Sequence, residues 1–470
     1  MVQMDVILEE HNFLAPGPYS LPVVGYLPFL TSNLHERFTE MAHKYGPIFS
    51  LRLGSKLHVV VNSMGLVKVV AHDMDHTFAN RSPPLTALTI SYGGSDIAWS
   101  NNNTHWRNMR KLLVSQVLNN ANLKASQSFR TFEVKRTLNE VTKIGEKINL
   151  NEIAFNTEAN VVTCMLWGRS KSSEGKDSSY LGDGFREIEF KIVELLGAPN
   201  ISDYFPMLKW FDLQKGSEIC GGSWNIIIDG AVEEDGRTDF LQILLELKDA
   251  PTPYNNIHIK ALFMDIVTAA TDTTSTMVEW VMAEILNNQC VLRKVQNEIT
   301  KVIGIDNIVT ESHLPKLRYL DVVIKETFRL HPPLPLLVHR CPDKYCTVGG
   351  YTIPKGSIVF INIWAIHRDP NNWMNPLEFR PERFLNGNWD YNGNNLKFLP
   401  FGSGRRICAG IPLGEKMSMY ILASLLHSFN WMLPKDEEFE LSDEFGMVTK
   451  KRKPLMAIPS QRISDASLYK

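Results

Sequence analysis

The chain has 470 residues, of which 44% are hydrophobic and 21% charged, and this balance is typical of a globular protein and excludes disordered and fibrous classes. A formal net charge of -2 provides no excess of basic residues, so we expect no nucleic-acid partner. Six scattered cysteines are too few for a disulfide scaffold and indicate a reducing compartment.

The amino-terminal segment is first polar and then rich in proline. Residues 1–14 carry acidic side chains and offer neither the apolar core of a signal peptide nor the roughly 20 apolar residues of a membrane span. Residues 15–26 contain the run Ala-Pro-Gly-Pro, which predicts a stiff, extended hinge. We therefore expect a polar stub and a hinge before the folded body, with a membrane anchor either absent here or never present.

Two short β-hairpins are predicted. Residues 48–53 and 57–61 are rich in apolar and β-branched side chains and flank the turn Gly54-Ser55-Lys56. Further along, Gly349-Gly350 and Pro354-Lys355-Gly356 bracket a second hairpin, whose second strand is expected over residues 357–362.

The remaining long segments have helical periodicity. The clearest helix is expected from about residue 258 to 286, which is roughly 45 Å at 1.5 Å per residue. Its acidic residues, among them Asp265 and Asp272, would be costly in lipid, so we interpret it as the buried central helix of a soluble body. The chain is therefore predicted to be mainly α with a minor β part, forming a single large domain over residues 27–470.

The segment from Phe401 to Gly410 is the most informative part of the sequence. It fits the pattern Phe-x-x-Gly-x-Arg-x-Cys-x-Gly and ends just before a helix predicted over residues 411–429. Glycines let the backbone approach a flat ligand and point amides at the sulfur of Cys408, and Arg406 can pair with a carboxylate of that ligand. The alternative interpretation is a buried structural cysteine in a glycine turn.

This pattern resembles the haem-thiolate signature of the cytochrome P450 superfamily, and the resemblance extends from about residue 15 to the carboxyl terminus. Glu326 and Arg329 match the family's Glu-x-x-Arg, and Arg383 lies in a segment similar to its partner motif. The resemblance implies the cytochrome P450 fold, in which these three residues form a buried charge network that supports the cysteine loop. Alone, Glu-x-x-Arg is a weak signal, because such pairs are common on solvated helix faces.

The resemblance also implies a haem b cofactor. Cys408 would be the axial ligand of the haem iron, within a loop formed by Phe401, Gly402 and Gly410. The propionates of the haem would face four residues that match family contacts, and these are Trp106, Arg110, Arg340 and Arg406. If these residues stood alone, an amphipathic helix with a buried tryptophan would be a slightly better explanation than a functional role.

The central helix carries a run similar to the family's oxygen-activation motif. Thr273 would hold oxygen or a relay water by its hydroxyl, and Asp272 would connect it to bulk protons. The alternative is that the threonines only satisfy helix carbonyls. The chain departs from the family at Ala270, where glycine is usual, and this methyl is expected to narrow the distal groove.

The family's substrate pocket maps onto mostly apolar positions, so we expect a small lipophilic substrate. The candidate pocket residues are Ala269, Ala270, Leu336, Leu337, Val338 and Met447. For any single leucine among them, core packing is the more ordinary role. A glycine-rich stretch between residues 214 and 239 is shorter than the helix that covers the pocket in the family. We therefore expect the cover over the site to be truncated in this chain.

The resemblance is strongest to plant microsomal A-type members. It implies a monooxygenase that inserts one oxygen atom of O2 into its substrate, with terpenoid hydroxylation favoured over phenolic or flavonoid hydroxylation. Electrons would come from NADPH through NADPH-cytochrome P450 reductase, with Lys111, Arg405 and Lys416 as candidate docking residues. The protein would be a monomer at the membrane surface, on the cytosolic face of the endoplasmic reticulum.

Two other functional classes stay open at this point. A haem-thiolate isomerase or dehydratase would rearrange a peroxide without external electrons, and the presence of Asp272 and Thr273 argues against it. A poorly active haem-binding variant is favoured only by the short glycine-rich region.

Overall fold

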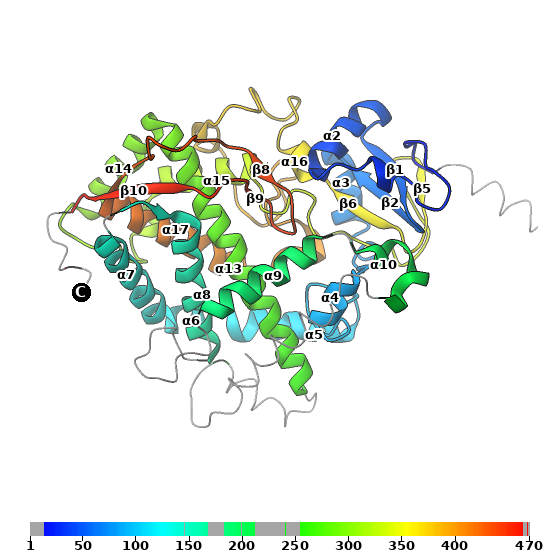
Figure 1. The fold of residues 1–470 in the computed structure, drawn as a ribbon, viewed down its shortest axis with the longest axis horizontal. Coiled ribbons are helices and arrows are strands. Elements are labelled where there is room, and N and C mark those ends of the chain that lie inside the picture. Colours follow the sequence, from blue (N-terminus) through cyan, green and yellow to red (C-terminus); the bar gives the residue numbers. More distant parts are fainter. Residues whose placement is uncertain are drawn as a thin grey trace, which may run out of the picture.

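The computed structural model describes residues 14–144, 146–167, 183–198, 200–211, 240, 254–463 and 468. A large helical body occupies most of the molecule, and a smaller part built from strands and short helices lies at one side (Figure 1). The mainly α prediction with a minor β part is confirmed. The glycine-rich region that raised doubt about the roof lies outside the described residues, apart from the single residue Phe240 that follows it.

The β part is built on the first predicted hairpin, which is confirmed. Strand β1 (Ile48–Leu53) pairs antiparallel with β2 (Lys56–Val61), and β2 pairs in parallel with β6 (Ile358–Ile361). The prediction for the second hairpin was wrong in its pairing. Its turn at Gly349-Gly350 joins β4 (Cys346–Val348) to β5 (Tyr351–Ile353), whereas β6 leaves to join β2. The mostly buried apolar side chains of β6 explain this choice, because they need a buried neighbouring strand.

Helix α13 (Asn256–Asn287) is the predicted central helix, and 22 of its 32 residues are buried. Asn255 begins it with a capping box, in which its side chain accepts from the backbone amide of His258 while the His258 ring accepts from the amide of Asn255. Helices α8 (Leu150–Trp167), α15 (Arg318–Leu330) and α17 (Ile411–Ser428) pack against α13. The helix predicted after the cysteine loop is thus present as α17.

The remaining elements surround this centre. The other helices are α2 (Leu34–Tyr45), α3 (Met64–Lys68), α4 (Leu85–Ile90), α5 (Thr104–Leu112), α6 (Asn120–Ala125), α7 (Gln127–Ile144), α9 (Asp183–Gly197), α10 (Ile201–Tyr204), α14 (Gln289–Ile303) and α16 (Ile363–Ile366). The other strands are β3 (Ile148–Asn149), β7 (Phe429–Met432) and β10 (Met456–Gln461), in the order β3-β10-β7, and the pair β8 (Asp443–Glu444) and β9 (Lys450–Lys451).

The segment predicted as a hinge is attached to the β part. Ser50 donates from its backbone amide to the carbonyl of Pro16 at 2.8 Å, and its hydroxyl donates to the carbonyl of Ala15 at 2.6 Å. Gly17 passes so close to this strand that a Cβ atom there would lie 1.7 Å from the carbonyl oxygen of Ser50. Among the helices in the described ranges, none combines the length and apolar character needed to cross a bilayer.

Candidate functional site

A cavity of about 350 Å³ lies between helix α13 and the loop that precedes α17. Thr273 lines it from α13, and Cys408 lines it from the loop. Its walls are largely apolar, but four arginine side chains reach it. These are Arg81, Arg110, Arg340 and Arg406.

The cysteine loop is held in its shape by glycines with positive φ. Gly404 has φ +65°, and a Cβ atom at this position would lie 1.9 Å from the carbonyl oxygen of Ala71, so only glycine fits. The amide of Cys408 donates to the carbonyl of Phe401 at 3.0 Å, which closes the loop. The amide of Gly410 donates to the Cys408 sulfur at 3.2 Å. The sulfur therefore faces the cavity with a backbone donor beside it.

The Cys408 sulfur is surrounded by protein even though its free surface faces the cavity. Burial raises the pKa of the Cys408 thiol, and the amide of Gly410 and the charge of Arg110 oppose this shift only in part. A thiol in this setting becomes a thiolate most readily when a metal ion takes the place of its proton.

Two of the arginines predicted to hold a ligand carboxylate lie around the loop, Arg340 buried and Arg406 half-buried. Arg340 donates through Nη2 to the carbonyl of Ser403 at 2.7 Å, whereas its buried Nη1 has no hydrogen-bond partner among the residues that the structure describes. Arg406 donates to the carbonyls of Ala79 at 2.7 Å and Ile97 at 3.0 Å. Burial is the main cause that lowers the pKa of Arg340 to about 10 and that of Arg406 to about 9.

The other two predicted ligand contacts come from α5. Arg110 donates to the carbonyl of Ile407 at 2.5 Å and lines the cavity. Trp106 is buried and is absent from the cavity lining. Its indole donates to the carbonyl of Ile97 at 3.1 Å, and the guanidinium of Arg406 lies 4.3 Å from its ring centre. Trp106 thus holds Arg406 in place through a cation–π contact and does not itself line the cavity.

Arg81 belongs to this group but was not predicted. It donates to the carbonyls of Val338 and His339 at 2.7 Å each and to that of Ala98 at 3.0 Å. Burial, followed by the charges of Arg406 and Arg340, lowers its pKa well below the usual range. Arg81 stands alone in the sequence, without a motif that could have identified it.

These features fit a haem group. Four guanidinium groups that are buried or half-buried around one cavity repel one another unless anions lie among them, and two propionates would supply those anions. The unpartnered Nη1 of Arg340 provides a free donor for one of them. The cysteine sulfur on the same cavity matches the axial ligand of a haem iron.

The oxygen-activation residues lie on two sides of α13. The hydroxyl of Thr273 donates to the carbonyl of Ala269 at 2.6 Å, and the residue lines the cavity. Asp272 is buried, does not line the cavity, and forms an ion pair with Lys450 of β9 at 2.6 Å. Burial raises the pKa of Asp272, and the charge of Lys450 lowers it. Asp272 thus points towards β9, whereas Thr273 faces the cavity.

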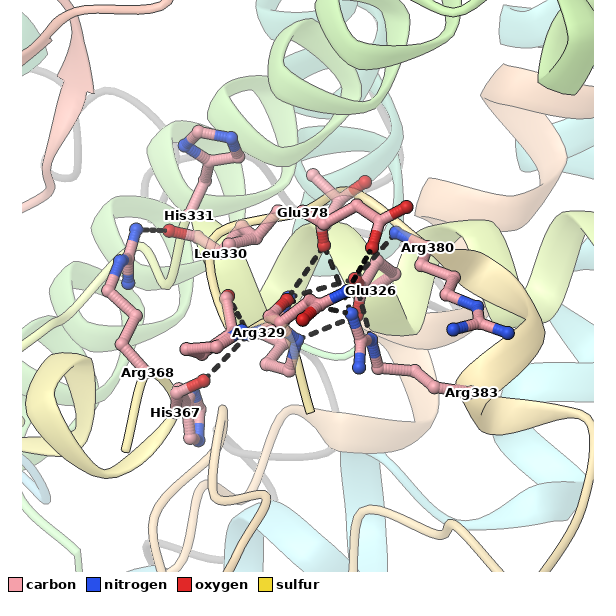
Figure 2. A network of polar contacts seen from close by, with 12 residues as sticks. Glu326, Arg329, Leu330, His331, His367, Arg368, Glu378, Arg380 and Arg383 are labelled. Atoms are coloured by element: carbon pink, nitrogen blue, oxygen red, sulfur yellow. Dashed lines mark hydrogen bonds and ion pairs between the residues drawn. The ribbon is translucent and has the colours of Figure 1, made fainter. Parts of the chain in front are cut away.

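The structure brings together all three members of the predicted charge network (Figure 2). Glu326 accepts from Arg329 at 2.7 and 2.9 Å and from Nε of Arg383 at 2.9 Å, and neither Glu326 nor Arg329 is exposed. The backbone amide of Arg380 also donates to Glu326, at 2.8 Å. The carboxylate therefore has charged and neutral donors together, as a buried carboxylate requires.

The network connects to the cysteine loop through His367. Arg329 donates to the carbonyl of His367 at 2.7 Å, and Nε2 of His367 accepts from the amide of Leu399 at 2.9 Å. Burial lowers the pKa of His367 to about 3, so its ring is neutral and can accept this bond. The carbonyl of Leu399 then accepts from Gly402, the second residue of the loop. Sequence reasoning did not identify His367.

Five of the six predicted pocket residues line the cavity. The exception is Leu336, which is 4% exposed and packs in a separate cluster with residues such as Phe38 and Phe49. This prediction needs correction, because the chain turns at this point and directs the next two side chains to the cavity instead. The residues that line it are Ala269, Ala270, Leu337, Val338 and Met447.

The family model for cytochrome P450 matches residues 15–458, and the chain therefore belongs to this family of haem-thiolate monooxygenases. Its fold agrees with solved members. A zebra fish cytochrome P450 solved with progesterone superposes with a TM-score of 0.79 at 25% identity, covering 92% of this chain and 100% of that chain.

Plant relatives are similar along almost the whole chain. A flavonoid 3'-monooxygenase of Crocosmia x crocosmiiflora is 36% identical and covers 96% of this chain and 93% of its own length. A geraniol 8-hydroxylase of Catharanthus roseus is 34% identical, with coverage of 95% and 94%.

Proposed function

We propose that Cys408 ligates the iron of haem b and that the chain uses this haem to hydroxylate a small lipophilic molecule. The observation that carries the proposal is a single cavity lined by the Cys408 sulfur on one side, Thr273 on the other, and four arginine side chains, of which Arg81 and Arg340 are buried. Arg340 and Arg406 would hold the propionates, with Arg81 and Arg110 beside them. When bound, the haem supplies the activation of O2, which the thiolate favours over reversible binding.

Thr273 and Asp272 would handle protons. The Thr273 hydroxyl can turn from the Ala269 carbonyl towards the cavity and hold a water there, while the helix carbonyl remains as an acceptor. Asp272, paired with Lys450, would exchange protons with the side of α13 that faces away from the cavity. The two neighbouring residues would thus pass a proton across the helix.

A terpenoid is the favoured substrate, and a phenolic or flavonoid is the alternative. The largely apolar cavity suits either, and hydroxylases named for geraniol and for flavonoids are both among the relatives. An alcohol such as geraniol needs only one polar contact, which suits an apolar wall better than a polyphenol does. Ala270 narrows the groove next to Thr273 and favours a slim substrate.

We also propose that NADPH-cytochrome P450 reductase supplies the electrons at the cytosolic face of the endoplasmic reticulum. Exposed apolar side chains support contact with a membrane surface: Tyr19 and Val23 are about 80% exposed, and Met207 is 88% exposed. The amino-terminal segment and the Met207 region are linked through the β1–β2 turn, since Gly54 bonds to Val24 and Ser55 to Tyr204. We expect a monomer there.

NADPH-dependent turnover tests this proposal. Purified protein with a plant reductase is incubated with panels of monoterpene alcohols and flavonoids, and products are identified by mass spectrometry. We expect a product heavier by one oxygen atom that requires both NADPH and O2. An isomerase or dehydratase would instead convert a peroxide without NADPH, and a haem protein that converts neither panel would contradict the proposal.

A further inference from the structure

The loop of residues 96–100, between α4 and α5, separates α13 from the arginine group. Three of its five carbonyls bind cationic or indole donors: that of Ile97 accepts from Arg406 and Trp106, that of Ala98 from Arg81, and that of Ser100 from Arg406. The position of two guanidiniums at the cavity therefore depends on the position of this loop.

The amides of the same loop bind carboxyl groups. The amide of Ile97 donates to Oδ2 of Asp265 on α13 at 2.5 Å. The amide of Trp99 donates to both oxygens of Asp96, at 3.1 and 3.2 Å. Two amides of the loop thus donate to the carboxyl groups of Asp96 and Asp265, and its carbonyls accept from Arg81 and Arg406. A shift of the carboxyl groups would therefore shift the loop and both arginines.

The two carboxyl groups also interact with each other, since each shifts the pKa of the other, and both line the cavity. Such a contact requires one proton between them, because two adjacent buried carboxylates repel strongly. Burial raises the pKa of Asp96 to about 6, and burial together with the charge of Asp96 raises that of Asp265 well above its usual range. The raised pKa of Asp265 favours a pair that keeps one proton and one negative charge.

Arginine and histidine side chains lie on two sides of the carboxyl pair. Arg81 and Arg406 face it across the loop and stabilise its single negative charge. Towards α5, His105 bonds to the carbonyl of Ser95 at 3.0 Å and packs against the ring of His258, 4.6 Å between centres. Burial lowers the pKa of His258, so a measurement above neutral pH separates the carboxyl pair from this histidine.

We propose that Asp265 is a positioning residue: by sharing a proton with Asp96, it fixes the loop of residues 96–100 and thereby holds Arg81 and Arg406 in place to retain the haem. The inference rests on the proposed haem site, but it holds for any substrate. Loss of the shared proton would separate the carboxyls and loosen the arginine group.

The test follows haem transfer from the purified holoprotein to excess apomyoglobin, without substrate or reductase. Asp265→Ala should release haem about tenfold faster at pH 7, since it removes a buried bond to a charged group. Asp265→Asn should stay within about twofold of the parent protein, because its amide can both accept from Ile97 and donate to Asp96. Equal release from the alanine variant and the parent would overturn the proposal.

The pH dependence separates proton sharing from simple packing. Release from the parent protein should accelerate as the pH rises above neutrality and the pair loses its proton. Asp265→Asn and Asp96→Asn should show no such rise, because their amide hydrogens do not dissociate. Both asparagine variants preserve shape, so this comparison decides the matter even if the alanine variant does not fold.

A parent rate without this rise, or variants that rise as steeply, would overturn the proposal, whereas a purified protein without haem would instead contradict the proposed function.

Discussion

At the scale of single residues, the Thr273 hydroxyl is the group whose loss should change the outcome of the reaction. We predict that Thr273→Ala retains haem but releases hydrogen peroxide in place of product. The reason is that the hydroxyl that holds the relay water is lost, so protons are no longer delivered to the correct oxygen atom. Product and peroxide formed per NADPH consumed are the quantities to measure. Unchanged product yield per NADPH would contradict the relay role.

Lys450 should set the pH range in which Asp272 works. It lowers the pKa of Asp272, so Lys450→Met leaves burial to act alone and raises that pKa. Less Asp272 is then ionised at a given pH, and the acid limb of the turnover profile should move to higher pH. Lys191→Met, which removes an exposed pair with Glu194, is the matched control. A profile that does not move in the Lys450 variant would show that Asp272 does not exchange the proton.

Sequence could identify the residues of this site that lie in motifs, but not those that stand alone. Cys408, Arg406 and Thr273 lie in sequence motifs whose residue types and spacing indicate their roles. Arg81 and Asp96 have no such context, and their roles come from a fold that places residues far apart in the chain on one cavity. Asp265 was noticed only as a charge that argued against a membrane span.

At the scale of elements, the charge network on α15 should contribute strongly to stability. Glu326→Gln leaves Arg329 and Arg383 buried without their counter-charge, and we predict a loss of about 3–5 kcal/mol in the free energy of unfolding. Urea unfolding of the haem-loaded protein measures it. Glu194→Gln, in an exposed pair on α9, should have little effect. A loss below about 1 kcal/mol for Glu326→Gln would show that the network is not fully assembled.

Helices were easier to predict than strand pairing for a physical reason. The bounds of α13 and α17 follow from local signals that the sequence displays directly, such as the Asn255 cap of α13 and the proline in the first turn of α17. The pairing of β6 with β2 joins residues about 300 positions apart, as in Val59 with Val359, and no local pattern encodes it. The prediction that Leu336 lines the cavity was wrong for a similar reason. A single turn of the backbone decides whether a leucine side chain faces the cavity or packs in the core.

At the scale of the whole molecule, docking of the reductase should depend on salt. Of the candidate residues, Lys111 is exposed, whereas Arg405 pairs with Asp75 at 3.4 Å and Lys416 with Glu311 at 3.1 Å. We predict that turnover falls as salt rises from about 0.05 M to about 0.5 M, because screening shortens the reach of these charges. Lys111→Glu should raise the reductase concentration needed for half-maximal turnover. Substrate affinity, measured by optical titration, should change little, and turnover insensitive to salt would argue against electrostatic docking.

The bond from the Cys408 sulfur to a haem iron is the central claim, and the spectrum of the reduced, carbon-monoxide-treated protein tests it most directly. We predict a strongly red-shifted band for the parent chain and for Cys290→Ser, whose cysteine is exposed on α14. Cys408→Ser should lose that band. A purified protein without haem, or a red-shifted band that survives in Cys408→Ser, would contradict the account.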